Sequence, residues 1–238
     1  MRYLVASDLH YGLEQLDWIA ARATSFDAVV LGGDHLDVVG RVDLNVQIAL
    51  MSAYLGRLAD RTTVVANPGN HDLTSRRGDG EKAATWMQEL DRRVWTDGRT
   101  LVLGDDLVSV CAWWEGPATL AELEAQLDAD AARRTGAPWI WVYHSPPDRS
   151  PTSWSGTRHF GDDVLNRLVV TFRPDVVLTG HVHEAPFRPD GSWYDRIDDT
   201  VVLNAGRRSG PIPAHLILDT ATREVTWWGA AEPATAAF

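Results

Sequence analysis

The chain has 238 residues, of which 45% are hydrophobic and 23% charged, and this ordinary globular composition predicts one large α/β domain with a sizeable core. The net charge of −11 and the absence of a Lys/Arg-rich run argue against a broad basic face for stable nucleic-acid binding. Carboxylates clustered around metal ions would add to the same negative charge, so a phosphorylated substrate stays compatible with it. Cys111 is the only cysteine, which excludes an internal disulfide and a cysteine-based zinc cage.

The N-terminal segment carries no signal for export or membrane insertion. Residues 3–6 are apolar, but this run is too short for a signal-peptide core and leads directly into Asp8 and His10. No apolar run approaches the ~20 residues that a membrane helix needs. The sequence therefore predicts a soluble, cytoplasmic protein without a membrane partner.

The first predicted strand, residues 2–7, leads into two potential metal ligands, Asp8 and His10. Side chains i and i+2 of an extended backbone point to the same side. Asp8 and His10 can therefore converge on one ion; a polar strand end at the surface is the alternative. A helix over residues 13–24 follows, with its apolar residues on one face.

The second predicted strand, residues 27–31, ends in a further carboxylate, Asp34. Gly32 and Gly33 lie between the strand and Asp34, and they remove side-chain bulk where the backbone must pass close to another group. His35 is an additional polar group beside this strand end, and a surface position is the alternative to a role next to the metal ligands.

A helix over residues 42–59 has the apolar spacing of a helix that covers a sheet, and it leads to the third strand, residues 63–66. This strand turns sharply into Asn70, His71 and Asp72. An amide oxygen suits a hard divalent ion that already has carboxylate and imidazole partners. His71 would lie beside such an ion and titrates near neutrality. The alternative is a turn in which Asn70 caps a helix and His71 faces solvent.

The alternation of predicted strands and helices is interrupted in the middle of the chain. Residues 76–82 predict a charged, solvated loop and residues 83–90 a helix. From 94 to 114, short apolar runs separated by Asp-Gly and Asp-Asp turns predict antiparallel hairpins. Thr119 and Glu122 predict a capping box at the start of the next helix.

Two further strands end in histidines. Residues 139–143 precede His144, and residues 175–179 lead into His181 and His183, a second alternating pair. These strands have the continuous apolar character of buried strands.

The C-terminal part returns to short strands over residues 200–204, 214–218 and 224–228. The Ala-rich residues 230–238 predict a frayed tail. Because no linker or internal repeat divides the chain, residues 1–229 are predicted to form a single domain.

Five predicted strands thus end in potential ligands, and helices intervene between most of them. This alternation predicts parallel βαβ crossovers, in which the C-terminal strand ends share one edge and sites form there. Seven oxygen and nitrogen ligands are too many for one zinc ion and suit two divalent or mixed-valence ions, for which Mn, Fe or Zn fit the ligand types. The ligand residues are Asp8, His10, Asp34, Asn70, His144, His181 and His183.

The ordered set Asp-x-His, Gly-Gly-Asp, Gly-Asn-His-Asp, a strand-end His and Gly-His-x-His resembles the calcineurin-like metallophosphoesterase family. The resemblance implies an α/β (α+β) fold, a two-sheet β-sandwich flanked by helices, with a dinuclear metal centre and phosphoester hydrolysis. It also implies the division of the ligands: one ion takes Asp8, His10 and His183, the other takes Asn70, His144 and His181, and Asp34 bridges them.

The resemblance further implies that His71 contacts the phosphate and assists departure of the leaving group. Asp72 either orients His71 or caps a helix. The expected reaction is hydrolysis of a phosphomonoester or phosphodiester of a small molecule by a hydroxide held between two metal ions. The alternatives are a catalytically weak metal-binding scaffold or interaction protein with the same fold, and a nuclease.

Substrate selection is expected in the Ser/Pro-rich loop 148–161 and in the turn at Trp113 and Trp114. Long ordered loops are often functional. These segments supply aromatic surface together with Arg158 and His159. In the alternative interpretation the tryptophans only pack and the loop is passive.

Overall fold

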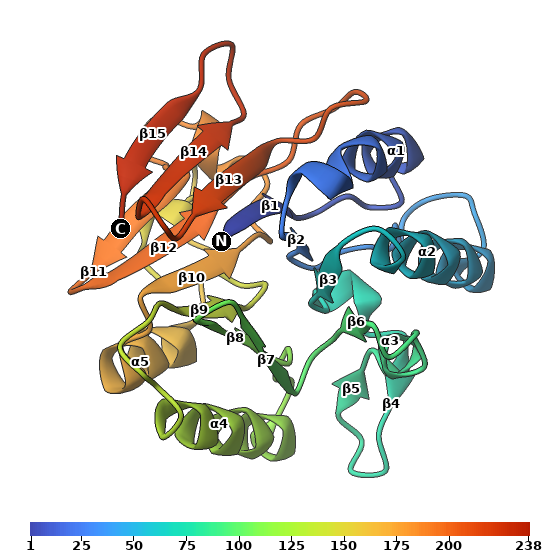
Figure 1. Ribbon diagram of the computed structural model, residues 1–238. Coiled ribbons are helices and arrows are strands. Elements are labelled where there is room, and N and C mark those ends of the chain that lie inside the picture. Colours follow the sequence, from blue (N-terminus) through green and yellow to red (C-terminus); the bar gives the residue numbers. More distant parts are fainter.

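Two β-sheets packed face to face form the centre of the computed structural model, which describes residues 1–238 (Figure 1). Helices cover the outer face of each sheet. The predicted fold class, a two-sheet α/β sandwich flanked by helices, is confirmed.

The first sheet has seven strands in the order β15-β14-β13-β1-β2-β3-β6. Strands β1, β2, β3 and β6 are parallel to one another, and the other three pair antiparallel. The strands are β1 Arg2–Ala6, β2 Ala28–Leu31, β3 Thr63–Ala66, β6 Val94–Trp95, β13 His215–Asp219, β14 Glu224–Trp228 and β15 Ala234–Ala237.

The second sheet has six strands in the order β11-β12-β10-β9-β8-β7. Its four inner strands are parallel, and each edge strand pairs antiparallel with its neighbour. The strands are β7 Arg99–Leu103, β8 Asp106–Val110, β9 Trp139–Val142, β10 Val176–Thr179, β11 Tyr194–Ile197 and β12 Thr200–Asn204; β4 Ser75–Arg76 and β5 Lys82–Ala83 form a separate small hairpin.

Helices lie on the outer side of both sheets (Figure 1). The outer face of the first sheet packs against α1 Leu13–Arg22, α2 Leu44–Ala59 and the short α3 Thr85–Gln88, and that of the second against α4 Pro117–Ala131 and α5 Asp163–Phe172. Short 3-10 helices occupy connections: η1 Ala23–Ser25, η2 Asn70–Asp72, η3 Pro151–Ser153 and η4 Ala185–Phe187.

The alternation of side chains explains why the central strands are apolar throughout. In β2, Val30 points into the core between the sheets, whereas Val29 packs beneath the helices on the other face. The same alternation places Ile140 of β9 between the sheets and Trp141 against α4 and α5. Strands that are buried on both faces are apolar along their whole length, because neither face contacts water. Polar residues occur only where these strands end.

The predicted frayed tail over residues 230–238 is wrong. Residues 234–237 form β15, which pairs with β14 along its length, and Phe238 packs into the core between the sheets. Alanine has a low intrinsic preference for strands, but the free edge of β14 supplies the pairing, and composition does not reveal that edge.

The middle of the chain departs from the predictions in two places. Val94–Trp95 pairs parallel with β3, so only β7 and β8 form a hairpin there. Residues 76–82 form the predicted charged and largely exposed turn, between β4 and β5, and the Glu81 carboxylate in addition accepts hydrogen bonds from the first amides of α4 at 2.8 and 2.9 Å. Thr119 therefore lies inside this helix, which begins at Pro117.

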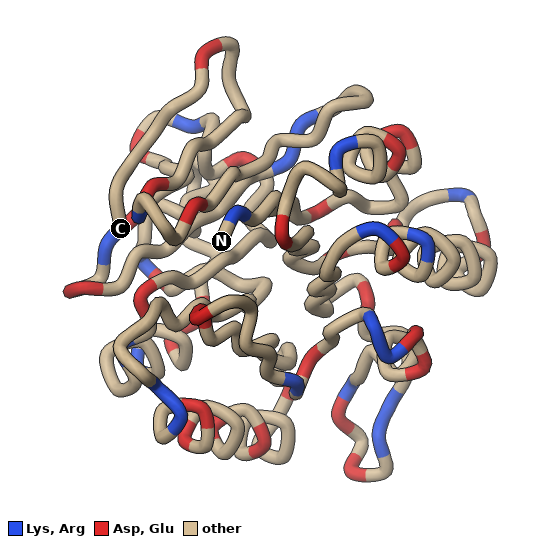
Figure 2. The backbone as a smooth tube through the Cα atoms, in the orientation of Figure 1, with Lys and Arg blue, Asp and Glu red and all other residues tan.

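Charged residues of both signs are interspersed along the backbone in the view of Figure 2. No helix combines the length and the apolar content needed to cross a membrane.

Candidate metal centre

The potential ligands gather where the carboxyl ends of strands from both sheets meet. Within this cluster the ligand atoms form two groups that share Asp34, and the atoms of each group lie within 4.8 Å of one another. The first group comes from β1, β2 and β10, and the second from β2, β9 and β10. The groups are Asp8, His10, Asp34 and His183, and Asp34, His144 and His181; Asn70 joins the second through a 2.9 Å contact with His181.

The first group has the spacing of ligands around one ion. The Nε2 atoms of His10 and His183 lie 2.9 Å apart, and His183 Nε2 lies 3.2 Å from Asp8 Oδ1. With metal–ligand bonds of about 2.0–2.2 Å, neighbouring ligand atoms stand roughly 3 Å apart. These nitrogen and oxygen atoms can therefore contact one ion without a large movement.

The second group contains a nitrogen that is ready to bind a metal. His144 is fully buried, and its Nδ1 lies 2.6 Å from the carbonyl oxygen of Gly32. Because a carbonyl oxygen only accepts, Nδ1 carries the proton and Nε2 has a free lone pair in the neutral imidazole. This Nε2 is buried without a hydrogen-bond partner and lies 3.3 Å from Asp34 Oδ2. An orphaned buried nitrogen directed at a carboxylate fits a divalent ion.

Left-handed backbone turns direct the ligands into the cluster. The φ angles are 57° at Asp8, 43° at His10, 55° at Asp34 and 66° at His181, a region that residues other than glycine seldom adopt. Strand β1 ends at Ala6, so Asp8 and His10 converge through these turns and not through the expected extended alternation. Such backbone strain is typical of functional sites.

Glycines allow the loops to pack against the ligands. A Cβ atom at Gly33, where φ is 98°, would lie 2.5 Å from Nδ1 of His144, and a Cβ atom at Gly69 would collide with the Asp34 side chain. The expectation that the backbone passes close to another group at Gly33 is confirmed, and the other group is a ligand.

Burial and charge set the protonation of the cluster. Burial raises the pKa of Asp34, but the charge of His144, 3.3 Å away, outweighs this effect and holds the pKa well below the usual range. Burial lowers the pKa of His144, but the charge of Asp34 overrides it and raises this pKa to about 9. Burial lowers the pKa of His10 and of His181 to about 4, so both are neutral near pH 7. Carboxylates and neutral imidazoles are the forms that bind metals, so Asp34, His10 and His181 are in these forms near pH 7, whereas His144 gives up a proton when an ion binds.

His71 stands beside both groups and remains accessible. Its amide donates to Asp34 Oδ1 at 2.9 Å, and its Nε2 lies 3.9 Å from Asp34 Oδ2. The ring contacts that of His10 edge-on, with centroids 4.7 Å apart, and the side chain is 24% exposed. An imidazole in this position can reach a molecule bound at the cluster.

Asp72 binds backbone amides, as expected if it caps a helix and does not orient the imidazole of His71. It is fully buried, and its carboxylate accepts from the amides of His35, Leu36 and Gly69 at 2.9–3.2 Å. It has no hydrogen bond to the imidazole of His71. Asp72 therefore joins the loops after β2 and β3, and it positions His71 only through the backbone.

The other polar residues near the predicted site have their own contacts. His35 is buried and its Nε2 lies 2.9 Å from the carbonyl oxygen of Asn67, which ties two loops together. In loop 148–161, Trp154 packs on His159, and Arg158 lies over Phe160. These contacts stay within the loop and involve no metal ligand.

Trp113 does reach the second ligand group. Its ring lies 5.8 Å from that of His144 and 5.6 Å from that of His181, measured between centroids. Trp114 points elsewhere and donates its indole N–H to Asp162. The sequence-based interpretation missed Arg207 and Arg208, although they follow the end of β12 just as the ligands follow their strands.

Residues 1–185 match the family model for calcineurin-like phosphoesterases, so the chain belongs to this family. Membership and the Asp/His cluster together support a metal-dependent phosphoester hydrolase. No protein with curated annotation matches the chain significantly.

Solved structures share the fold at low sequence identity. TT1561 of Thermus thermophilus is 18% identical and has a TM-score of 0.58, covering 99% of this chain and 98% of its own. Purple acid phosphatase PPD1 from yellow lupin (Lupinus luteus) seeds is 12% identical with a TM-score of 0.60, over 100% of this chain but 53% of its own. GAP50, described as the anchor in the inner membrane complex of Plasmodium, is 10% identical with a TM-score of 0.51, over 95% and 83%. Likeness at these identities shows the fold alone.

Proposed function

We propose that this chain hydrolyses phosphate esters of a small molecule with two metal ions bound at the cluster. The observation that supports two ions is the sharing of Asp34 by two ligand groups, each compact enough for one ion. The first ion would be held by Asp8, His10 and His183, the second by Asn70, His144 and His181, with Asp34 between them. Mn, Fe and Zn fit these oxygen and nitrogen ligands.

Two such ions supply a water of lowered pKa and neutralise charge on the phosphoryl oxygens. The chain contributes orientation and proton transfer. Asp34 receives the amide of His71 at 2.9 Å, and this contact fixes the start of η2 against the ligands. His71 then has its imidazole beside the bound phosphate, where a protonated Nε2 donates to the departing oxygen.

A small phosphorylated substrate is favoured over nucleic acid, because basic residues are dispersed among acidic ones (Figure 2) and the net charge is −11. Whether the substrate is a monoester or a diester depends on groups outside the ligand set. A protein with this fold is described as an anchor, so the fold by itself does not support catalysis. The full ligand set and His71 support the enzyme over the scaffold.

The proposal is tested by turnover of p-nitrophenyl phosphate and bis(p-nitrophenyl) phosphate, with and without Mn²⁺, together with the metal content of the protein. We expect metal-dependent hydrolysis of at least one ester and two metal ions per chain. Asp34→Asn should lose both, since one carboxylate serves both ions. Asp128→Asn, at an exposed position of α4, is the matched control and should retain both. Full metal content and normal turnover in Asp34→Asn would contradict the shared carboxylate, and absence of any turnover would favour the scaffold.

A further inference from the structure

A cavity of about 530 Å³ opens directly beside the first ligand group. One side of it is formed by the ligands His10 and His183. The N-terminal end of α1, residues 12–15, and the segment 207–210 between β12 and β13 form other parts of the lining. Figure 1 shows this connection extending beside α1. A molecule bound at the metal cluster can therefore extend into the cavity.

The segment 207–210 is held in place by hydrogen bonds from both neighbours. Gln15 of α1 is buried, and its Nε2 donates to the carbonyl oxygens of Arg208 and Gly210, each at 2.9 Å. The amide of Arg207 donates to the carbonyl oxygen of the ligand His183 at 2.9 Å. The wall that carries the two arginines is thus connected to α1 and to a metal ligand by hydrogen bonds that hold its backbone in place.

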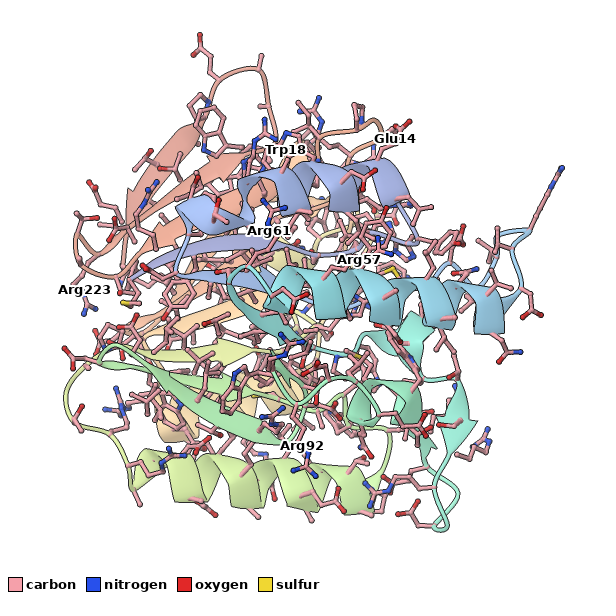
Figure 3. The ribbon with its side chains drawn as sticks, turned by 45° about the vertical axis from the view of Figure 1, so that its right-hand side comes forward. Glu14, Trp18, Arg57, Arg61, Arg92 and Arg223 are labelled. Atoms are coloured by element: carbon pink, nitrogen blue, oxygen red, sulfur yellow. The ribbon has the colours of Figure 1, made fainter.

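The chemistry of the lining is polar and cationic. Arg207 and Arg208 are exposed and form no ion pair, whereas Arg77 and Arg167 are paired with glutamates. Glu14 is the one acidic side chain in the lining, and it is exposed on α1 (Figure 3). Only two of the lining residues are hydrophobic, and none is Phe, Tyr or Trp, so the only rings in the lining are the imidazoles of the ligands His10 and His183.

We propose that this cavity binds a second anionic group of the substrate, a carboxylate or a second phosphate, through Arg207 and Arg208. The inference rests on the proposed phosphoesterase function and names its substrate class: a small, polar phosphate ester with another negative charge in its non-reacting part. Guanidinium groups suit both anions, because their planar N–H donors match carboxylate and phosphate oxygens.

Two matched pairs of ligands test this inference as competitive inhibitors of whichever nitrophenyl ester the Mn²⁺-loaded protein hydrolyses. Phosphoglycolate is compared with ethyl phosphate, and ethylene glycol bisphosphate with ethylene glycol monophosphate. We expect a doubly anionic ligand to bind about tenfold more tightly than its partner, the size of one charge-assisted contact. Preference in the first pair alone identifies a carboxylate site, and preference in the second pair alone a phosphate site. Equal inhibition within both pairs would overturn the inference.

Variants separate the arginines from the metals as the source of the preference. Arg207→Gln and Arg208→Gln should each reduce the ratio of inhibition constants toward one. Arg61→Gln is the matched control, because Arg61 (Figure 3) is exposed at the start of β3, the end opposite to the ligands, and should keep the ratio. A preference that survives in both cavity variants would overturn the role of the arginines.

Failure of the proposed anion site can be distinguished from failure of the proposed phosphoesterase activity. If neither nitrophenyl ester is hydrolysed with any metal, the proposed function fails. The same ligand pairs are then titrated calorimetrically into the Mn²⁺-loaded protein. Tighter binding of the doubly anionic ligands, lost in Arg207→Gln, would still support the cavity, and equal binding would reject it.

Discussion

In this centre, the hydrogen bond that one imidazole nitrogen makes determines whether the other nitrogen can bind a metal. His144 illustrates the point, because the Gly32 carbonyl oxygen holds the proton on Nδ1 and leaves Nε2 directed at Asp34. The acceptor is a backbone carbonyl oxygen, which no side-chain substitution removes. The backbone fold therefore fixes the tautomer of His144. The ligand set is therefore already arranged for metal binding in the polypeptide.

His71 is predicted to act on the substrate and not on the metals. Its side chain is 24% exposed, and its nearest carboxylate oxygen is 3.9 Å away. We expect His71→Ala to retain two metal ions per chain and to lose turnover by roughly 10²–10⁴-fold if His71 donates a proton. The loss should be smaller for p-nitrophenyl esters, whose leaving group departs without a proton.

Metal content by elemental analysis and kcat for good and poor leaving groups check this prediction. Equal losses for both kinds of leaving group would make His71 a residue that only positions the phosphate. Loss of one metal would show that the ligand assignment is wrong.

Asp97 is predicted to make the stability of the protein depend on pH. Its Oδ1 is buried without a hydrogen-bond partner in the turn between β6 and β7, and burial raises its pKa to about 6. In an unfolded chain the pKa is about 3.9. Because the folded state holds the proton more tightly, this carboxyl contributes its full stability below about pH 4, and the contribution is lost as the pH rises through about 6.

Asp97→Asn removes the titration. We expect the variant to unfold at higher denaturant than the parent chain near pH 7, by about 1–3 kcal/mol of unfolding free energy, and to match it near pH 4. Urea unfolding at several pH values measures the difference. A difference that does not change with pH would show that folding does not raise the pKa of Asp97.

At the scale of the element, the strands that end in ligands were predictable and their partners were not. Buried apolar runs such as β2 followed by Asp34 are visible in the sequence because burial on both faces removes every polar residue until the strand stops. Nothing local in β9 says that it joins a different sheet from β2, since that depends on contacts across the chain. The capping of α4 by Glu81 was not predictable either, because these residues are far apart in the sequence.

The C-terminal strand β15 is a contact that the sequence did not predict, and its contribution to stability can be measured. Phe238 is 9% exposed in the core between the sheets, and its backbone exchanges hydrogen bonds with Arg223. We expect Phe238→Ala to lower the unfolding free energy by about 2–4 kcal/mol, near the range for truncating a buried phenylalanine. Denaturant unfolding measures this loss. Phe160→Ala, at a side chain 40% exposed, is the control and should cost less than about 1 kcal/mol; equal costs would mean that β15 frays in solution.

At the scale of the whole molecule, the centre joins the two sheets at their carboxyl ends. The first sheet supplies Asp8, His10, Asp34 and Asn70, and the second supplies His144, His181 and His183. The sequence-based interpretation expected one shared edge and correctly brought the residues together. The edge belongs to two sheets, and for this reason each proposed ion has ligands from both.

Metal binding should therefore stabilise the association of the sheets. An ion at one hundred times its Kd adds about 2.7 kcal/mol if it binds only the folded state. For a domain of 150–250 residues this corresponds to a rise in Tm of about 5–10 °C. We expect calorimetric scans to show that rise with Mn²⁺ and its reversal by EDTA, with no rise in Asp34→Asn and the full rise in Asp128→Asn. Hydrogen exchange should slow at the carboxyl ends of β1 and β2 and equally at those of β9 and β10. Slowing in one sheet alone would mean that the ions bind to ligands of that sheet and do not connect the two.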